Sequence, residues 1–194
     1  MKTAAKLLRG LTVPPVMVAL LFGFLYVART DVVHTATDLW LSLLFFAVIP
    51  ALAYPLQMIV PALRPGGQRM RRRLAFVFSL VGYTAALTVS LLRGAVPNLA
   101  YVDAVYLSSV VVLTLINLLT PWRASGHACS LVGPIALLCC FFGVKLLLPA
   151  ALVIGLSLWS ALYLKRHTVR EFALGAAASL SSLLLMYPIF LPVF

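Results

Sequence analysis

Long apolar runs separated by short polar segments dominate this 194-residue chain. A helix needs about 20 apolar residues to cross the hydrocarbon core of a bilayer, with a range of about 17–25. Runs of this kind predict spans at 11–28, 39–63, 74–92, 101–120, 127–144, 147–164 and 170–191. The segments between them leave no room for a soluble domain. We therefore expect an all-α transmembrane bundle of about six or seven helices, folded as one integral membrane domain over residues 1–194.

Composition agrees with a membrane protein, because 63% of the residues are hydrophobic and only 10% are charged, against about 25% charged in soluble domains. The net charge of +11 does not indicate a nucleic-acid partner here. The basic residues lie in short loops between apolar runs, where membrane topology and contact with anionic lipids explain them. The first run follows three basic residues, as in a signal peptide, but it is long and lacks a clear cleavage site, which favours a retained helix.

The basic residues are distributed unequally between the two sides of the predicted bundle. Alternating crossings place most of them on one side: Lys2, Lys6, Arg9, Arg64, Arg69, Arg71, Arg72, Arg73, Arg123, Lys165, Arg166 and Arg170. The other side receives Arg29, Arg93 and Lys145. By the positive-inside rule the basic side is cytoplasmic. Lys2, Lys6 and Arg9 are expected to lie outside any functional site.

Two histidines fall on this basic side, each at the start of a predicted helix. His127 opens the fifth run and His167 opens the seventh. The fifth and sixth runs cross the membrane and return as a tight hairpin, so the two histidines can be neighbours in space. Polar and ionisable residues are expensive near hydrocarbon, and their presence at matched depth indicates a function.

Phosphoryl transfer without a metal needs a nucleophile, an acid for the leaving oxygen, and cations or N–H donors for the other oxygens. Histidine can be the nucleophile or the acid. Glu171 follows His167 by four residues, so a helix would place both side chains on one face. Ser125 and Gly126 offer a hydroxyl and an exposed backbone just before His127, and helix N-termini bind anions.

These residues resemble the motifs of a known family. Ser125-Gly126-His127 resembles the P-S-G-H signature of the type-2 phosphatidic acid phosphatase superfamily, the membrane lipid phosphatases related to vanadium haloperoxidases. The segment from Ser160 to Glu171, followed by Gly175, resembles that family's S-R-x5-H-x3-D motif. The resemblance covers roughly residues 110–185. It implies a family-like core over about 74–191 and an extra N-terminal helix at about 11–28.

The resemblance implies a role for each matching residue. His167 would be the nucleophile that forms a phosphohistidine, Glu171 would orient it in place of the usual aspartate, and His127 would protonate the leaving group. Ser125 and Gly126 would bind phosphate oxygens.

The sequence departs from the family pattern at several positions. Ala161 stands where the family has a phosphate-binding arginine, Ala124 replaces a proline, and Arg64-Pro65 lacks the lysine of the family's first motif. Substitute cations are therefore expected among a few basic residues, with Arg123 preferred because it lies just upstream of Ser125. The candidates are Arg123, Lys165, Arg166, Arg69 and Arg73. The cluster from Arg69 to Arg73 can equally be a topology determinant that contacts anionic lipid.

The predicted function is a metal-independent and cofactor-independent membrane phosphatase. Its substrate would be a lipid phosphate or diphosphate of the phosphatidic acid, phosphatidylglycerol phosphate or polyprenyl diphosphate class, entering sideways from the leaflet at the cytoplasmic face. Three alternatives remain open on the same residues. They are a lipid phosphotransferase, a protein that binds or transports a lipid head group without hydrolysis, and a structural membrane scaffold.

Overall fold

The computed structural model describes residues 1–190, which form helices and connecting turns with no strand among them. The helices are α1 (Lys2–Leu11), α2 (Pro14–Ala28), α3 (Ala36–Leu43), α4 (Ile49–Ala51), α5 (Ala53–Ile59), α6 (Gly67–Leu92), α7 (Pro97–Leu119), α8 (Gly126–Phe142), α9 (Leu147–Tyr163) and α10 (Val169–Phe190). A π-helical turn, η1 (Leu44–Val48), lies between α3 and α4. The all-α fold predicted from the apolar runs is confirmed.

The seven apolar runs predicted up to seven membrane-spanning helices, but fewer helices within residues 1–190 are long enough to span a membrane. Five segments qualify by length and hydropathy: Ala36–Ile59, Gly67–Leu92, Pro97–Leu119, Val144–Tyr163 and Val169–Phe190. A sixth is possible if α1 and α2, which meet at a bend of 52°, count as one span. The run at 11–28 is broken ahead of Pro14 and Pro15, and the run at 127–144 is cut short because Gly143 ends α8 with a φ of 81°. These findings are consistent with a multi-pass integral membrane protein.

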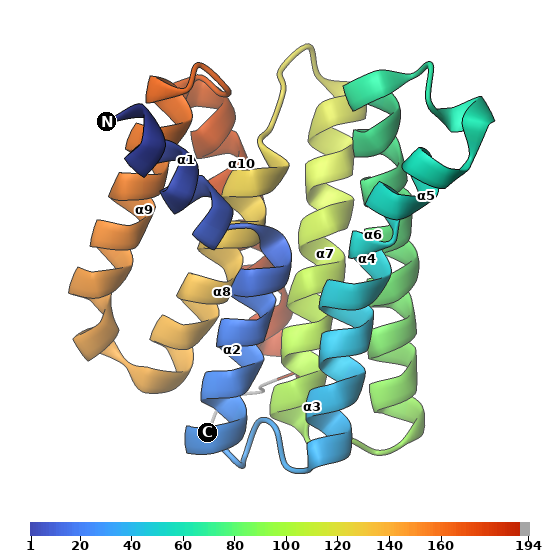
Figure 1. The fold of residues 1–194 in the computed structure, drawn as a ribbon. Helices are drawn as coiled ribbons and strands as arrows, with labels where there is room; N and C mark the ends of the chain where they lie inside the picture. Colours follow the sequence, from blue (N-terminus) through green and yellow to red (C-terminus); the bar gives the residue numbers. More distant parts are fainter. Residues whose placement is uncertain (191–194) are drawn as a thin grey trace.

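The helices surround the middle of the bundle as a ring (Figure 1). α7 packs against α6 and α10, and α10 packs in turn against α8. α2 lies between α8 and the α3–η1 segment, which closes the ring against α6. α9 lies outside the ring beside α8, and α1 crosses over α9 at the upper end of the view in Figure 1.

An aromatic cluster packs between the helices of this ring. Phe22 from α2, Phe46 from η1, Tyr83 from α6 and Tyr106 from α7 have ring centroids between 4.5 and 6.4 Å apart. Gly82 makes the close approach of α6 possible, because a Cβ at this position would overlap the carbonyl oxygen of Phe45 in the π-helical turn. π-helical turns free a carbonyl from regular pairing and often mark functional regions.

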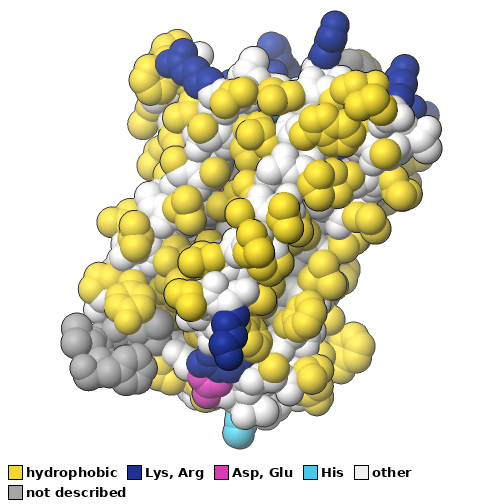
Figure 2. Space-filling model, turned by 90° about the vertical axis from the view of Figure 1, so that its left-hand side faces the viewer, with side chains coloured by type: hydrophobic (Ala, Val, Ile, Leu, Met, Phe, Trp, Pro, Cys, Tyr) yellow, Lys and Arg dark blue, Asp and Glu magenta, His cyan; other side chains and the backbone are white. Residues whose placement is uncertain are grey.

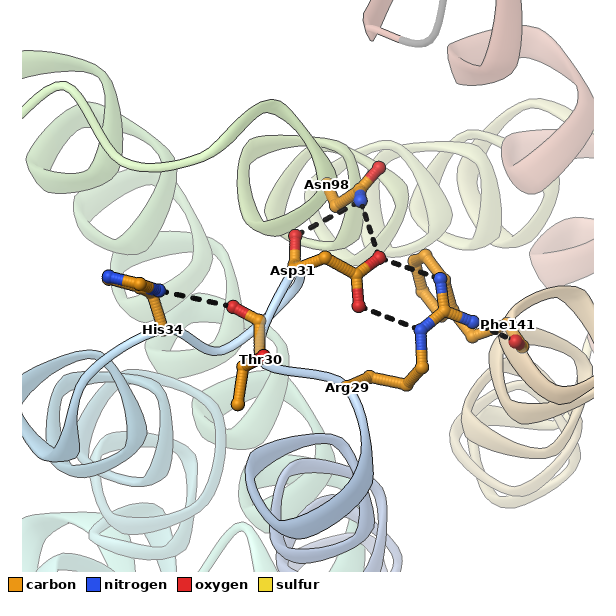
Figure 3. Close-up of polar contacts among 6 residues, drawn as sticks. All are labelled: Arg29, Thr30, Asp31, His34, Asn98 and Phe141. Carbon is orange, nitrogen blue, oxygen red and sulfur yellow. Dashed lines mark hydrogen bonds and ion pairs between the residues drawn. The ribbon is translucent and has the colours of Figure 1, made fainter.

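The two ends of the bundle differ in charge. Figure 2 shows Lys and Arg side chains along the upper edge, with mostly hydrophobic side chains over the flank below. At the opposite end, Arg29 donates to both carboxylate oxygens of Asp31 at 2.8 and 2.7 Å and also to the carbonyl oxygen of Phe141 (Figure 3). Asn98 donates to Asp31 as well, at 3.2 Å. These contacts join the ends of α2, α7 and α8. His34 is exposed at this same end.

Candidate functional site

A large open cavity of about 1560 Å³ lies inside the ring of helices. At the basic end of the bundle its wall includes His127, His167 and several arginines, and deeper in the bundle the wall becomes apolar and reaches the aromatic cluster. The prediction that the two histidines share one site is therefore supported by their place on the wall of a single cavity. Their helices are held together by α10, which packs against α8.

His167 is positioned by the start of α10. It lies just before the helix, and its Nδ1 is 3.1 Å from Glu171 Oε2, as the four-residue spacing predicted. The same carboxylate oxygen accepts the backbone N–H of Thr168 at 3.3 Å, while Thr168 Oγ1 accepts the N–H of Glu171 at 3.2 Å. This is a capping box, T-x-x-E, which fixes the first turn of a helix. Glu171 therefore orients the imidazole and caps the helix at once.

Burial lowers the pKa of His167 below its ordinary value. The hydrogen bond and charge of Glu171 act in the opposite direction and raise that pKa, whereas the positive charges of Arg9 and Arg123 lower it further. The net direction is downward, so the ring is mainly neutral at pH 7. A neutral imidazole has a free lone pair, which a nucleophile needs. Because Nδ1 faces Glu171, the nitrogen available to a ligand is Nε2.

His127 is the second residue of α8 and lies at the cavity wall. Its Nε2 is 3.3 Å from Thr12 Oγ1, in the bend between α1 and α2. Thr12 donates its own hydroxyl hydrogen to the carbonyl oxygen of Leu8 at 3.0 Å, which leaves the Thr12 oxygen to accept the N–H of His127. The orientation of His127 therefore depends on a residue from the N-terminal segment.

The predicted phosphate ligands Ser125 and Gly126 differ in their surroundings. Ser125 is buried, and its hydroxyl accepts the N–H of Ala128 at 3.2 Å as the N-cap of α8. Within residues 1–190 the cavity wall includes Gly126 but not Ser125. Ser125 is therefore a structural cap here, because its hydroxyl is needed to satisfy the first turn of the helix. Gly126 keeps its predicted place beside the site.

The start of α8 and the start of α10 are also joined through the backbone. The N–H of Ser125 donates to the carbonyl oxygen of Glu171 at 2.9 Å. Gly175, one turn further along α10, lies so close that a Cβ there would overlap the carbonyl oxygen of Ser125. The glycine that trails the second motif thus allows the two histidine-bearing helix starts to meet. Asn117 adds a further tie, because its Oδ1 accepts the N–H of Ala124 at 3.0 Å.

We expect Gly175→Ala to lower the midpoint of thermal unfolding by about 4 °C or more, because the added methyl group must push α10 away from α8. Gly155→Ala in α9 is the matched control, since a Cβ there meets nothing within 4 Å. Thermal unfolding of the purified variants measures the effect. An equal response in both variants would show that Gly175 is not at a close contact.

The predicted cations divide into two groups. Arg69, Arg73 and Arg123 lie on the cavity wall, together with Arg72. Lys165 and Arg166 are exposed, and the cavity wall formed by the described residues does not include them. They end α9 instead: Lys165 has a φ of 51°, and the N–H of Arg166 donates to the carbonyl oxygen of Ala161 at 3.0 Å. The structure therefore does not bring Lys165 and Arg166 to the cavity wall, because the reversal of the chain turns them outward.

Arg9 is the cation that sequence reasoning excluded and the structure places at the site. It is half-buried on the cavity wall, and its Nη1 is buried without a hydrogen-bond partner among residues 1–190. α1 brings it there by packing on α9, where Ser160 Oγ donates to the carbonyl oxygen of Ala5 at 2.8 Å. Ala161, which stands where the family has an arginine, is buried next to this contact. The expectation that Arg9 lies outside the site is therefore wrong.

A spacing in the sequence could have identified Arg9. Ala5, Arg9 and Thr12 recur at intervals of four and three residues, which is one face of a helix. Ala5 and Thr12 are buried, at 0% and 4% exposed, whereas Lys6 is exposed. Lys2 shares the face of Ala5 and Arg9, but it is the first residue of the helix and is exposed. Arg9 lies on the inward face, and the three basic residues of the N-terminus should not be treated as one group.

No family model, curated protein or solved structure matches this chain. The resemblance to the lipid phosphatase superfamily therefore stays a prediction from two short motifs. Among residues 1–190 no group of three or more His, Cys, Asp or Glu side chains is arranged to hold a metal ion. The ionisable side chains at the site are the two histidines, Glu171 and the arginines on the cavity wall.

Proposed function

We propose that this protein is a membrane phosphatase that removes phosphate from a lipid phosphate or diphosphate through a phosphohistidine. The observation that carries the proposal is that His127 and His167, from separate helices, line one cavity with Arg9, Arg69 and Arg123. His167 also has the carboxylate partner that orients a nucleophilic imidazole. A cluster of cations beside two imidazoles suits a phosphate group.

In the proposed reaction, Nε2 of His167 attacks phosphorus and forms an N–P bond while the P–O bond to the lipid breaks. His127 donates a proton to the leaving oxygen, so the lipid departs as an alcohol or a monophosphate. Without a substrate, burial and the positive charges of Arg9 and His167 lower the pKa of His127 to about 4, so the step requires the negative charge of the bound phosphate to bring the proton to His127. His127 then takes a proton from water, which attacks the phosphohistidine and releases inorganic phosphate. Glu171 stabilises the positive charge that develops on His167. Arg9, Arg123 and the N–H groups at the start of α8 would hold the non-bridging oxygens.

We propose that this chemistry occurs at the cytoplasmic face, because the positive-inside rule assigns the basic end of such a bundle to the cytoplasm. A lipid alcohol in place of water would make the protein a phosphotransferase with the same first step. The strongest alternative is a protein that binds a lipid head group without hydrolysis. Two observations favour that alternative: Ala161 replaces an expected arginine, and Ser125 is buried as the N-cap of α8, away from the cavity wall formed by the described residues.

Phosphate release tests the proposal directly. The purified full chain is incubated with dioctanoyl phosphatidic acid, with a short-chain phosphatidylglycerol phosphate and with farnesyl diphosphate, and inorganic phosphate is measured. We expect release from at least one of them without added metal, and inhibition by vanadate, which imitates pentacoordinate phosphorus. No release from any substrate, with retained binding of the lipids, would favour the binding protein. Transfer of phosphate to an added lipid alcohol would identify the phosphotransferase.

The pKa of His167 predicts the pH dependence. The nucleophile must be neutral, so activity is lost as the pH falls through its pKa, and burial places that pKa below the ordinary value of about 6.5. Glu171 raises the pKa, so Glu171→Gln should move the acidic limb of the profile to lower pH while it reduces the maximal rate. A profile of kcat/KM against pH for both proteins measures this. A limb that moves to higher pH would contradict the assigned pairing.

A further inference from the structure

The cavity continues beyond the basic end into the apolar interior of the bundle, and we call this part the inner cavity. On one side it is lined by a stripe of α8 residues that follow His127 at the spacing of a single helix face. The stripe consists of Ser130, Gly133, Pro134 and Leu137. The opposite wall comes from α6 and α7, and includes Phe76, Ser79 and Leu113. The inner cavity ends at Phe46, Tyr83 and Tyr106 of the aromatic cluster.

The position of His127 gives this stripe a direction. In the proposed reaction His127 protonates the oxygen of the leaving group, which carries the lipid chain either directly or through a second phosphate, so the chain leads away from His127. From there the α8 stripe extends about 10 Å to Pro134, at a rise of about 1.5 Å per residue. Leu137, the next residue of the stripe, has no exposed surface and closes the inner cavity together with Phe46. An inorganic phosphate or a sugar phosphate would leave this apolar space to water, whereas a hydrocarbon chain would remove apolar surface from water.

We propose that the inner cavity binds the hydrocarbon chain of the substrate inside the bundle, between α6, α7 and α8, instead of leaving it in the surrounding bilayer. The ligand class is a phosphate or diphosphate ester of a flexible chain, either acyl or prenyl, with its head at the two histidines. The proposal rests on the proposed function for the direction of the chain. It goes beyond that function because it states where the hydrocarbon chain lies. It also states that the aromatic cluster limits how deep the chain can reach into the bundle.

Gly133→Leu tests the inner cavity from the α8 side. A Cβ at this position would lie 3.4 Å from the Cβ of Ser179 on α10, another residue of the cavity wall. This contact leaves no room for a leucine between α8 and α10, so we expect the larger side chain to extend into the inner cavity. The full-length protein is reconstituted into phosphatidylcholine vesicles, and phosphate release is compared for dodecyl phosphate and p-nitrophenyl phosphate. We expect the ratio of the two rates to fall by about tenfold or more, because burial of several methylene groups is lost.

Gly155→Leu is the matched control, because a Cβ at Gly155 in α9 meets open space, and its ratio should equal that of the unmodified protein. Ser79→Phe obstructs the inner cavity from α6, so it covers the case in which Gly133→Leu does not fold. Thr84→Phe, at an exposed position of the same helix, is its control. An unchanged ratio in either folded obstructing variant would overturn the proposal, because the chain would then lie outside the bundle.

A binding measurement separates this proposal from the proposed function. Thermal stabilisation by dodecyl phosphate is compared with stabilisation by ethyl phosphate, which has the same head and almost no chain. In one outcome the protein releases no phosphate, dodecyl phosphate stabilises it more than ethyl phosphate does, and Gly133→Leu removes this difference. That outcome would support the chain-binding site and contradict the proposed phosphatase activity. If phosphate is released but neither obstructing variant changes the preference for dodecyl phosphate, the phosphatase stands and the chain site fails.

Discussion

Replacing His167 by asparagine is expected to lower the rate of phosphate release by about a thousandfold or more, since removal of a covalent nucleophile costs on that order. Asparagine can keep a hydrogen bond to Glu171 but cannot form a stable bond to phosphorus. The His167 imidazole is held 3.1 Å from Glu171 Oε2 on the cavity wall, so the variant removes the reacting atom and little packing. Release of phosphate from the best of the three test substrates, corrected for the amount of folded protein, measures the effect.

Two other histidine variants make this result specific. His34→Asn is the matched control, because His34 is exposed at the opposite end of the bundle, and its rate should equal that of the unmodified protein. His127→Ala should still become labelled with phosphate from p-nitrophenyl phosphate, because this leaving group needs no acid. The acid-labile label should persist, because the variant lacks the base that takes a proton from the attacking water. Full activity of His167→Asn, or a label on that variant, would remove the proposed mechanism.

Arg9→Ala is expected to lower kcat/KM by about a hundredfold, the usual effect of removing one preorganised donor to the transition state. The reason is that Arg9 has a buried nitrogen without a partner among residues 1–190 and lies on the cavity wall with both histidines. Arg9→Lys should recover part of the loss, because the charge returns without the planar fork of donors.

Lys6→Ala is the matched control for Arg9, because Lys6 is an exposed basic residue of the same helix. If loss of charge at α1 acted only through attraction to anionic lipid, both variants would weaken activity equally, and the effect would disappear in neutral vesicles. A loss confined to Arg9→Ala, with the same size in neutral vesicles, would assign Arg9 to the phosphate.

Much of the fold followed from the sequence because apolar length and loop charge are strong local signals. The predicted hairpin of 127–144 and 147–164 is present as α8 and α9, and the pairing of His167 with Glu171 followed from helix periodicity alone. The sequence predicted one continuous helix over 11–28, but the structure has a break before Pro14 and Pro15. Hydropathy alone does not detect such a break.

The errors in the candidate site have a different physical origin. Whether Ser125 faces a ligand or caps its own helix depends on a rotation of one side chain, and both outcomes use the same sequence pattern. Lys165 and Arg166 were expected at the site, but the left-handed conformation of Lys165 turns the chain there. Arg9 was missed because its place depends on a contact between α1 and α9, whose hydrogen-bonded residues lie 155 positions apart in the sequence.

This last contact also constrains biosynthesis. The hydrogen bond from Ser160 to Ala5 joins residues 155 positions apart, so α1 leaves the ribosome long before its docking partner. Contacts of such high sequence separation form late, after the intervening segments have been ordered. Although α1 precedes α9 in translation, it is thus among the last segments to reach its final place, and a partially inserted chain would carry its histidines without the guanidinium of Arg9 beside them.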